Sequence, residues 1–149
     1  MLGIGNGNVQ AVPVDYAARM NAIELDQLLE QCIQPPAGKK RTPVYQVVVI
    51  MGSTEQGAID PLVEVINLRK KYEQRGLSFV IHCDAAWGGY FASMIRLPAK
   101  GVKGVLPGPF VPEDTISKYV QEQVLAFNQS DSITIDPHKY AQKLTLDDG

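Results

Sequence analysis

The sequence predicts an α/β fold with a mostly parallel β-sheet and flanking helices, and two observations carry this prediction. Two short runs typical of strands, the β-branched run Val44–Ile50 and the run Leu77–His82, enclose a segment with helical periodicity, which is the order of a βαβ unit. A third short run, Ser132–Ile135, follows another segment with the features of a helix. Because a parallel crossover needs a connection of about a dozen residues or more, this order favours parallel pairing of the strands.

The first elements along the chain are a short strand and a helix. Loose alternation of apolar residues predicts a strand at Val9–Val14. Asn21 with Glu24 three residues later is a capping-box variant, so we expect a helix to begin there. The segment Pro35–Gly38 predicts its end, because proline does not continue a helix. The apolar residues of this helix at helical spacing are Leu25, Leu28, Leu29 and Cys32.

The βαβ unit occupies the centre of the chain. The near-continuous apolar run Val44–Ile50 is typical of a strand buried on both faces of a parallel sheet. Asp60 and Pro61 predict the start of the next helix, with Asp60 as the cap and Pro61 at the first helical position. Gly76 predicts the end of that helix, directly before the strand Leu77–His82.

The remaining residues predict a loop, a helix and a last strand. Frequent proline and glycine predict a loop over residues 98–114. Asp114 or Thr115 is expected to cap a helix that runs to about Phe127, and the strand Ser132–Ile135 follows.

Composition places the chain among ordinary globular proteins. The 149 residues include 14 Lys and Arg against 16 Asp and Glu, a formal charge of −2, with 45% apolar and 20% charged residues. These values favour a single domain over residues 1–149 and exclude a nucleic-acid binder that works through bulk positive charge. No run approaches the ~18–20 apolar residues of a membrane span, so we expect no membrane partner. The N-terminus lacks the features of a signal peptide, and Cys32 and Cys83 are expected to be reduced core thiols, so we expect a cytoplasmic protein.

Reactive side chains gather where the predicted strands end, and ligands of open α/β sheets bind beyond the carboxyl ends of the strands. A lysine amine at such an edge can form an imine with an aldehyde, and a carboxylate on a neighbouring strand can hold a protonated pyridine nitrogen. Alanine and glycine after a strand let a flat ring lie close to the backbone. Together these features indicate a pyridoxal phosphate site. The residues concerned are Ser53, Thr54, His82, Asp84, Ala85, Ala86, Gly88, Gly89, Asp136, His138 and Lys139.

A metal site is the competing use of the same region. Side chains alternate along a strand, so Cys83 is expected to point away from His82 and Asp84. The sequence also contains no C-x-x-C or H-x-x-x-H pair. We therefore expect no metal site.

Three segments at these strand ends resemble motifs of the pyridoxal-phosphate-dependent amino-acid decarboxylases, which include the glutamate, aromatic amino-acid and tyrosine decarboxylases. Residues 82–89 (HCDAAWGG) are similar to the family's H-V-D-A-A-[WY]-G-G, with Cys83 where the family has Val. Residues 132–139 (SITIDPHK) resemble the segment with the Schiff-base lysine, and residues 52–61 resemble G-[ST]-T-x-x-G-x-x-D-P. Glu55, the Gly-Gly-Tyr at residues 88–90 and the D-P-H-K spelling favour the tyrosine decarboxylase branch.

The resemblance implies roles for three residues at the reacting centre. Lys139 would bind the cofactor covalently as an imine and exchange a proton at the α-carbon of the substrate. Asp84 would pair with the pyridinium nitrogen, and Ala86 would pack on one face of the ring.

Further residues receive supporting roles from the same resemblance. His138 would lie near the cofactor phosphate, whereas Asp136, where many relatives have Asn, is expected to hold a backbone amide. Thr54, ahead of Ser53, would bond the ring hydroxyl or the substrate carboxylate, with a plain turn residue as the alternative. His82 is given a supporting role beside the cofactor, with a satisfied core histidine as the alternative.

The resemblance spans about residues 2–139 and implies the central part of a pyridoxal-phosphate-binding large domain of the aspartate-aminotransferase-like fold (fold type I). Members of the family are several hundred residues long and form their sites at a homodimer interface, so the resemblance implies a fragment. The function it implies is decarboxylation of an L-amino acid, aromatic and tyrosine-like, as part of a longer enzyme. The competing hypothesis is an inactive remnant, or an interaction module that associates with a full-length relative. We expect little or no turnover from the chain alone.

Overall fold

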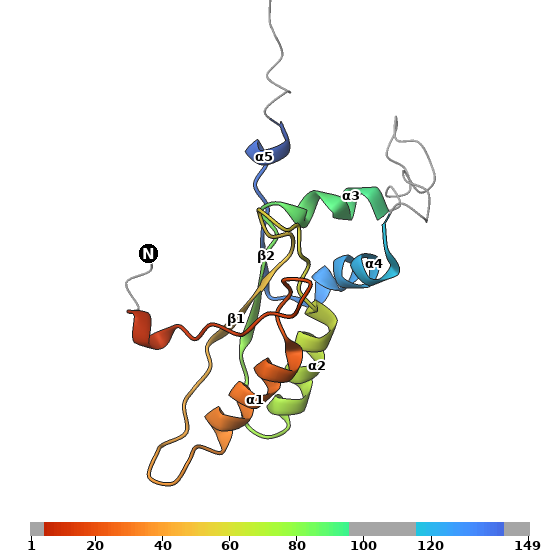
Figure 1. Cartoon of the computed structure of the whole chain (residues 1–149). Helices are drawn as coiled ribbons and strands as arrows, with labels where there is room; N and C mark the ends of the chain where they lie inside the picture. Colours follow the sequence, from red (N-terminus) through yellow and green to blue (C-terminus); the bar gives the residue numbers. More distant parts are fainter. Residues whose placement is uncertain (1–4, 96–115, 142–149) are drawn as a thin grey trace, which may run out of the picture.

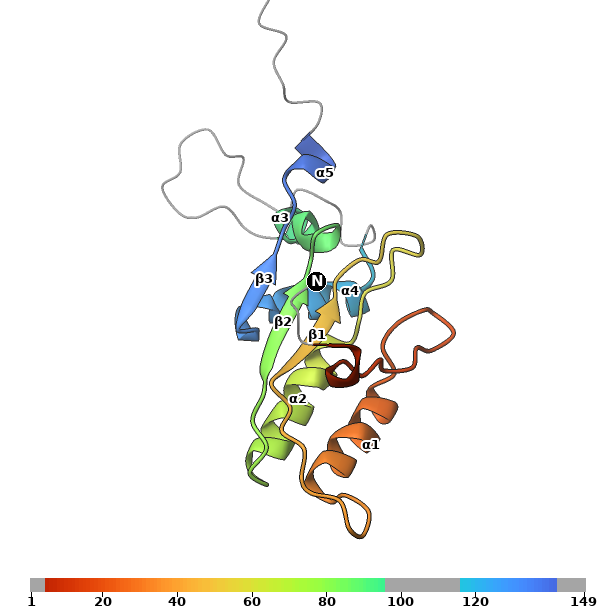
Figure 2. The same cartoon turned by 90° about the vertical axis from the view of Figure 1, so that its left-hand side faces the viewer.

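The computed structural model describes residues 5–95 and 116–141, and within these ranges three strands form one parallel sheet. The strands are β1 (Gln46–Ile50), β2 (Val80–Asp84) and β3 (Ser132–Thr134), in the order β1-β2-β3. Figure 2 shows them side by side with β2 in the middle and all three pointing the same way. The predicted α/β class and the parallel pairing are therefore confirmed.

Helices accompany the sheet, with α2 and α4 on one side of it (Figure 1). The apolar residues of α1, α2 and one face of the sheet form the core, in which Val49, Val65 and Ile81 are fully buried. No described helix is long and apolar enough to cross a membrane. The helices are α1 (Ala22–Ile33), α2 (Leu62–Glu73), α3 (Phe91–Ile95), α4 (Lys118–Leu125) and α5 (His138–Ala141), with single turns at η1 (Asn6–Asn8), η2 (Gly88–Tyr90) and η4 (Ala126–Gln129).

The sheet has one covered face and one open face. Val47 and Val49 are buried, whereas Val48 is 44% exposed and Val80 on the neighbouring strand is 45% exposed. Side chains alternate along a strand, so these two valines point to the face that no described α-helix covers. The prediction that the strand at Val44–Ile50 is buried on both faces is therefore wrong for the part of the chain that the structure describes.

Helix α1 begins and ends where the sequence predicts. The Oδ1 atom of Asn21 accepts hydrogen bonds from the backbone N–H groups of Ile23 (3.0 Å) and Glu24 (3.4 Å). These bonds satisfy two of the amide donors that every helix leaves free at its start. The helix ends at Ile33, ahead of the Pro35–Gly38 segment, as expected.

Asp60 does not cap α2, contrary to the prediction. The N-cap residue is Pro61, and the helix begins at Leu62. The Asp60 carboxylate is buried and turned away from the helix, where it accepts the N–H groups of Met20 (2.7 Å) and Ile50 (2.8 Å). Asp60 thus joins the segment before α1 to the end of β1, and burial raises its pKa.

The predicted strand at Val9–Val14 is absent from the described residues. Val14 makes only an isolated antiparallel bridge with Met20. Between them, the Asp15 carboxylate accepts the N–H groups of Ala17 and Arg19 and pairs with the Arg19 guanidinium, which forms a turn. Local side-chain bonds of this kind compete with strand pairing.

The cap of α4 also differs from the prediction. Ser117, and not Asp114 or Thr115, is the N-cap residue, and its hydroxyl accepts the N–H of Val120 (3.3 Å). The predicted loop over residues 98–114 lies outside the described residues.

Candidate active site

The carboxyl ends of the three strands meet at one edge, and Asp84 lies in the middle of it. Asp84 is the last residue of β2 and pairs with Ile50 at the end of β1 and Thr134 at the end of β3. The segments after the strands contain the predicted site residues, so the strand order gathers these residues at one edge (Figure 2). This is the place where open parallel sheets bind ligands.

The Asp84 carboxylate is half-buried and holds the turn after β2. Its Oδ1 atom accepts the N–H of Ala86 at 3.2 Å, and its backbone carbonyl accepts the N–H of Met51 at 2.8 Å. The carboxylate therefore stabilises the turn that follows β2. It also presents a negative charge beyond the central strand, where a cationic group of a ligand can pair with it.

Lys139 reaches the same edge from α5. Its Nζ atom lies 3.0 Å from Oδ2 of Asp136 and 5.5 Å from the centroid of the Trp87 ring. Trp87 belongs to the turn after β2. The Lys139 amine, which follows β3 in the chain, therefore lies against the segment that follows Asp84. The Lys139 side chain is 26% exposed.

Asp136 and His138, the two predicted residues next to Lys139, lie beside each other in the structure. The carboxylate of Asp136 pairs with the Lys139 amine, whereas the sequence suggested that it holds a backbone amide. The His138 side chain is 70% exposed, and its Nε2 atom lies 3.8 Å from Asp136. The structure therefore puts His138 next to Asp136, and its predicted contact with a phosphate stays a prediction.

His82 lies on the open face of β2 and contacts β3. Its Nδ1 atom is 2.8 Å from the hydroxyl of Ser132, and its Nε2 atom is 3.4 Å from the hydroxyl of Thr134. Both ring nitrogens thus have partners within the protein, which favours a supporting position over direct contact with a ligand. Cys83 is fully buried on the opposite face, as the strand alternation predicted.

The hydroxyls after β1 differ in their surroundings. Ser53 accepts the N–H of Ala58 at 3.0 Å and donates to the Gln56 side chain, so it stabilises the turn. Thr54 is exposed at the same turn. Of the two, Thr54 is the more exposed residue at the strand edge.

The glycines after β2 allow the strand ends to approach one another. A Cβ at Gly88 would lie 1.9 Å from the carbonyl oxygen of Met51, and one at Gly89 would lie 2.7 Å from Cγ1 of Ile135. Ala85 is fully buried. We expected Ala85, Ala86, Gly88 and Gly89 to make room for a flat ring. This expectation is wrong for Ala85, Gly88 and Gly89, because other parts of the protein fill the space beside them. Ala86 is half-buried and remains the small residue next to Asp84.

Sequence reasoning missed two features, one at the site and one at the start of β3. It gave no role to Trp87, whose ring faces the Lys139 amine. It also missed Asp131, whose carboxylate bonds the N–H of Ile81 and the guanidinium of Arg69. An acidic residue directly before a predicted strand is the signal that could have indicated Asp131.

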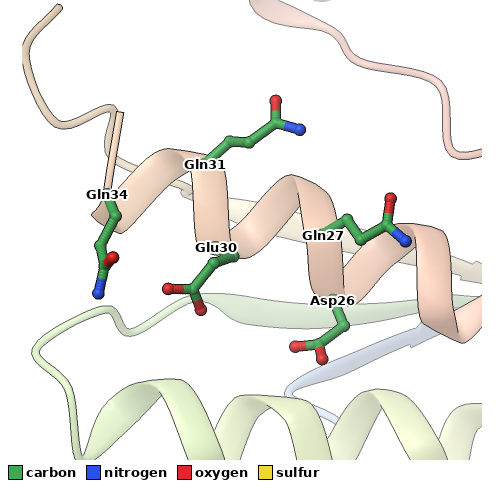
Figure 3. Close-up of a pocket in the computed structure, with 5 residues that line it drawn as sticks. All are labelled: Asp26, Gln27, Glu30, Gln31 and Gln34. Atoms are coloured by element: carbon green, nitrogen blue, oxygen red, sulfur yellow. The ribbon is translucent and has the colours of Figure 1, made fainter. Parts of the chain in front are cut away.

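A shallow polar depression on α1 lies at the opposite end of the sheet from α5 (Figures 1 and 3). Figure 3 shows Asp26 and Glu30 pointing toward α2, while Gln27 and Gln31 point away from it. Lys71 and Tyr72 already pair with Asp26, and Arg75 pairs with Glu30. The depression thus belongs to the contact between two helices. Residues 5–95 and 116–141 contain no group of three or more His, Cys, Asp or Glu side chains able to hold a metal ion.

Comparisons with known proteins agree on one kind of enzyme. Residues 2–106 match the model of the pyridoxal-dependent decarboxylase conserved domain. The chain is 38% identical to an L-tyrosine decarboxylase of Levilactobacillus brevis over 93% of its own length and 23% of that protein. It is 36% identical to an L-tyrosine decarboxylase of Enterococcus faecium (92% and 23%) and 32% identical to an aspartate 1-decarboxylase of Aliivibrio fischeri (93% and 19%).

The fold has a counterpart among solved structures. The crystal structure of mouse CSAD in its apo form superposes with a TM-score of 0.61 at 20% identity, over 94% of this chain and 23% of that one. The chain thus spans about a quarter of the length of the proteins it matches.

Proposed function

Because the chain belongs to the pyridoxal-dependent decarboxylase family, we propose that it is the central part of the large cofactor-binding domain of an amino-acid decarboxylase. The reaction removes CO2 from an L-amino acid and leaves the amine. The observation that supports it best is the position of the Asp84 carboxylate and the Lys139 amine on neighbouring strand ends, with the Trp87 ring beside the amine.

The residues present fit pyridoxal phosphate, the cofactor of this family. An amine can bind its aldehyde, and a carboxylate one strand away can bind its pyridine nitrogen. Lys139 and Asp84 supply these two groups at one edge of the sheet. When bound, the cofactor supplies an electron-withdrawing ring that stabilises the charge left at the α-carbon after CO2 leaves.

The roles of the protein groups follow from their chemistry. Lys139 would hold the cofactor and return a proton to the α-carbon of the substrate. The negative charge of Asp84 would keep the pyridine nitrogen protonated, because an opposite charge favours the charged form. Ala86 would pack against the ring, and Asp136 would keep the free lysine amine at the strand end until it binds.

Three further residues complete the proposed site. Thr54 would donate a hydrogen bond to the ring hydroxyl or the substrate carboxylate, and His138 would bind near the phosphate. His82 would support the site from the open face through its bonds to β3.

Borohydride reduction tests the assignment of Lys139. The purified chain is incubated with pyridoxal phosphate, reduced and digested, and the labelled peptides are mapped. We expect the pyridoxyl group on Lys139 in preference to exposed lysines such as Lys71, with loss of that label in Lys139→Ala. Labelling spread evenly over the lysines, or none on Lys139, would refute the proposal.

The substrate proposed is an aromatic amino acid of the tyrosine type, since the two relatives quoted above at 36–38% identity are L-tyrosine decarboxylases. The test is a chimera in which this chain replaces the matching segment of the Levilactobacillus brevis enzyme. Amine formation is compared for tyrosine, dihydroxyphenylalanine, glutamate and aspartate, and faster turnover of the acidic substrates would contradict the assignment. The longer enzyme is proposed to be a homodimer, located in the cytoplasm, where Cys32 and Cys83, both free thiols here, stay reduced.

A second candidate is an interaction module without turnover of its own, and the open face of the sheet with Val48 and Val80 favours it. Such a module would bind a full-length relative and form no amine alone. Robust amine production by the isolated chain would exclude this candidate.

A further inference from the structure

Asp131 lies directly before β3 and bonds the central strand through both its backbone and its side chain. Its N–H donates to the carbonyl of Ile81 at 2.9 Å, and its Oδ2 atom accepts the N–H of Ile81 at 2.7 Å. Both backbone groups of Ile81 are thus bonded to one residue. Because Ser130 and Ser132 stand on either side of Asp131, a shift by one position would replace the carboxylate with a hydroxyl.

Arg69 of α2 completes this arrangement. Its Nη1 atom lies 2.5 Å from the same Oδ2 atom of Asp131, and its Nη2 atom donates to the carbonyl of Gln129 at 2.8 Å. Hydrogen bonds between charged groups are the stronger ones. The Arg69–Asp131 clamp, defined by these two residues, therefore ties the start of β3 to both α2 and β2.

The ladder of β3 itself is short. It has three residues, paired as His82–Ser132, Cys83–Ile133 and Asp84–Thr134. A one-residue slip of a strand turns every side chain to the other face, so a short ladder needs a further interaction to fix its register. Lys139 lies five residues beyond Thr134, so the register of β3 decides where the lysine meets the turn after Asp84.

From this geometry we infer that Asp131 and Arg69 are positioning residues for Lys139. Neither lies at the strand edge where the cofactor would bind, and they act through β3 by fixing its register against β2. The inference rests on the proposed function in one respect, the role of Lys139 as the residue that binds the cofactor.

The test compares Asp131→Ala with Asp131→Asn in the purified chain. One readout is hydrogen exchange at the Ile81 and Ala85 amides, since Ala85 donates to Thr134 at 3.0 Å at the far end of the β3 ladder. The other is the share of pyridoxyl label on Lys139 after borohydride reduction, taken at equal folded fraction by near-ultraviolet circular dichroism.

We expect Asp131→Ala to speed exchange at both amides about tenfold, because the Ile81 donor loses its acceptor. The share of label on Lys139 should fall by a similar factor. Asp131→Asn keeps an acceptor oxygen but loses the charge that binds Arg69, so it should fall between wild type and Asp131→Ala. Glu30→Gln weakens the ion pair of Arg75 between α2 and α1, at similar exposure, and should change both readouts by less than about twofold.

Each outcome bears on a separate claim. Wild-type exchange and labelling in a folded Asp131→Ala would overturn the inference. If that variant does not fold, wild-type exchange and labelling in both single variants, Asp131→Asn and Arg69→Gln, would overturn it. A wild-type chain with no label on Lys139 would refute the proposed function instead, while the exchange data would still decide whether the clamp sets the register.

Discussion

The carboxylate of Asp84 is the single group whose removal best separates binding from catalysis at this strand edge. On the proposed function, Asp84→Ala should lower amine formation about 10²–10³-fold, because it would remove a charge proposed to stabilise the reacting state. The pyridoxyl label on Lys139 should still form, since Asp84 does not supply the amine. The measurement is turnover in the chimera alongside label mapping in the chain. Asp15→Ala, which changes a carboxylate paired with Arg19 in another turn, is the matched control.

A second residue-scale prediction concerns the buried Asp60. Burial raises its pKa above the ordinary 3.8, so the folded protein binds this proton more readily than the unfolded chain. The contribution of Asp60 to stability therefore falls as the pH rises from about 3.8 through the raised pKa, and is constant above it. Asp60→Asn should cost about 1–3 kcal/mol at pH 7. The N–H groups of Met20 and Ile50 reach different oxygens of Asp60, and an amide would turn its NH2 donor toward one of them.

Urea unfolding from pH 3 to pH 8 checks this prediction. The free energy of unfolding of wild type, relative to that of Asp60→Asn, should grow as the pH falls through the raised pKa of Asp60 toward 3.8. Asp15 is the control with the opposite sign, because the hydrogen bonds from Arg19 lower its pKa. The advantage of wild type over Asp15→Asn should therefore disappear as the pH falls below 3.8. Equal slopes for the two variants would contradict the assignment.

At the scale of elements, alanine substitutions in the turn after β2 should lower the free energy of unfolding according to what each new Cβ would meet. Gly88→Ala should lower the free energy of unfolding by about 3 kcal/mol or more, because its Cβ would overlap the Met51 carbonyl. Gly89→Ala should cost less, since it meets the side chain of Ile135, which is 40% exposed and can move. Gly7→Ala, with nothing near its Cβ, should stay within about 0.5 kcal/mol. Thermal unfolding ranks the three, and a Gly88→Ala protein as stable as wild type would refute the packing.

The elements also show what the sequence can and cannot predict. The helix at Asn21 and the strands around residues 46–50, 80–84 and 132–134 were predictable because their signals, a cap and β-branched runs, are local. The bonds of Asp60 to Met20 and of Asp131 to Arg69 join residues 40 and 62 positions apart, which no local pattern reveals. The same holds at the site, where the motif predicted roles for Lys139 and Asp84 but the pairing of Lys139 with Asp136 depends on the folded geometry.

At the scale of the whole molecule, the open face of the sheet exposes apolar side chains that another chain can contact. Val48 and Val80 lie on neighbouring strands, and His82, Ser132 and Thr134 continue the same face toward β3. No α-helix among the described residues covers this surface, and the turn η1 lies in front of the lower part of β1 in Figure 2. β3 is also an edge strand in the described sheet, and edge strands pair readily with other chains. The chain should therefore self-associate at micromolar concentration.

Val48→Lys combined with Val80→Lys should weaken that association, because a charge on an apolar contact surface must give up its hydration when the surface is buried. Light scattering after size exclusion should show the wild-type mass falling toward that of the monomer on substitution. Ile23→Lys, at a 70% exposed position on α1, is the matched control and should leave the mass unchanged. In the chimera the remaining segments should cover the same face, so the double substitution should there reduce folding yield and activity. Association that is indifferent to the two lysines would place the contact elsewhere, with the β3 edge as the next surface to change.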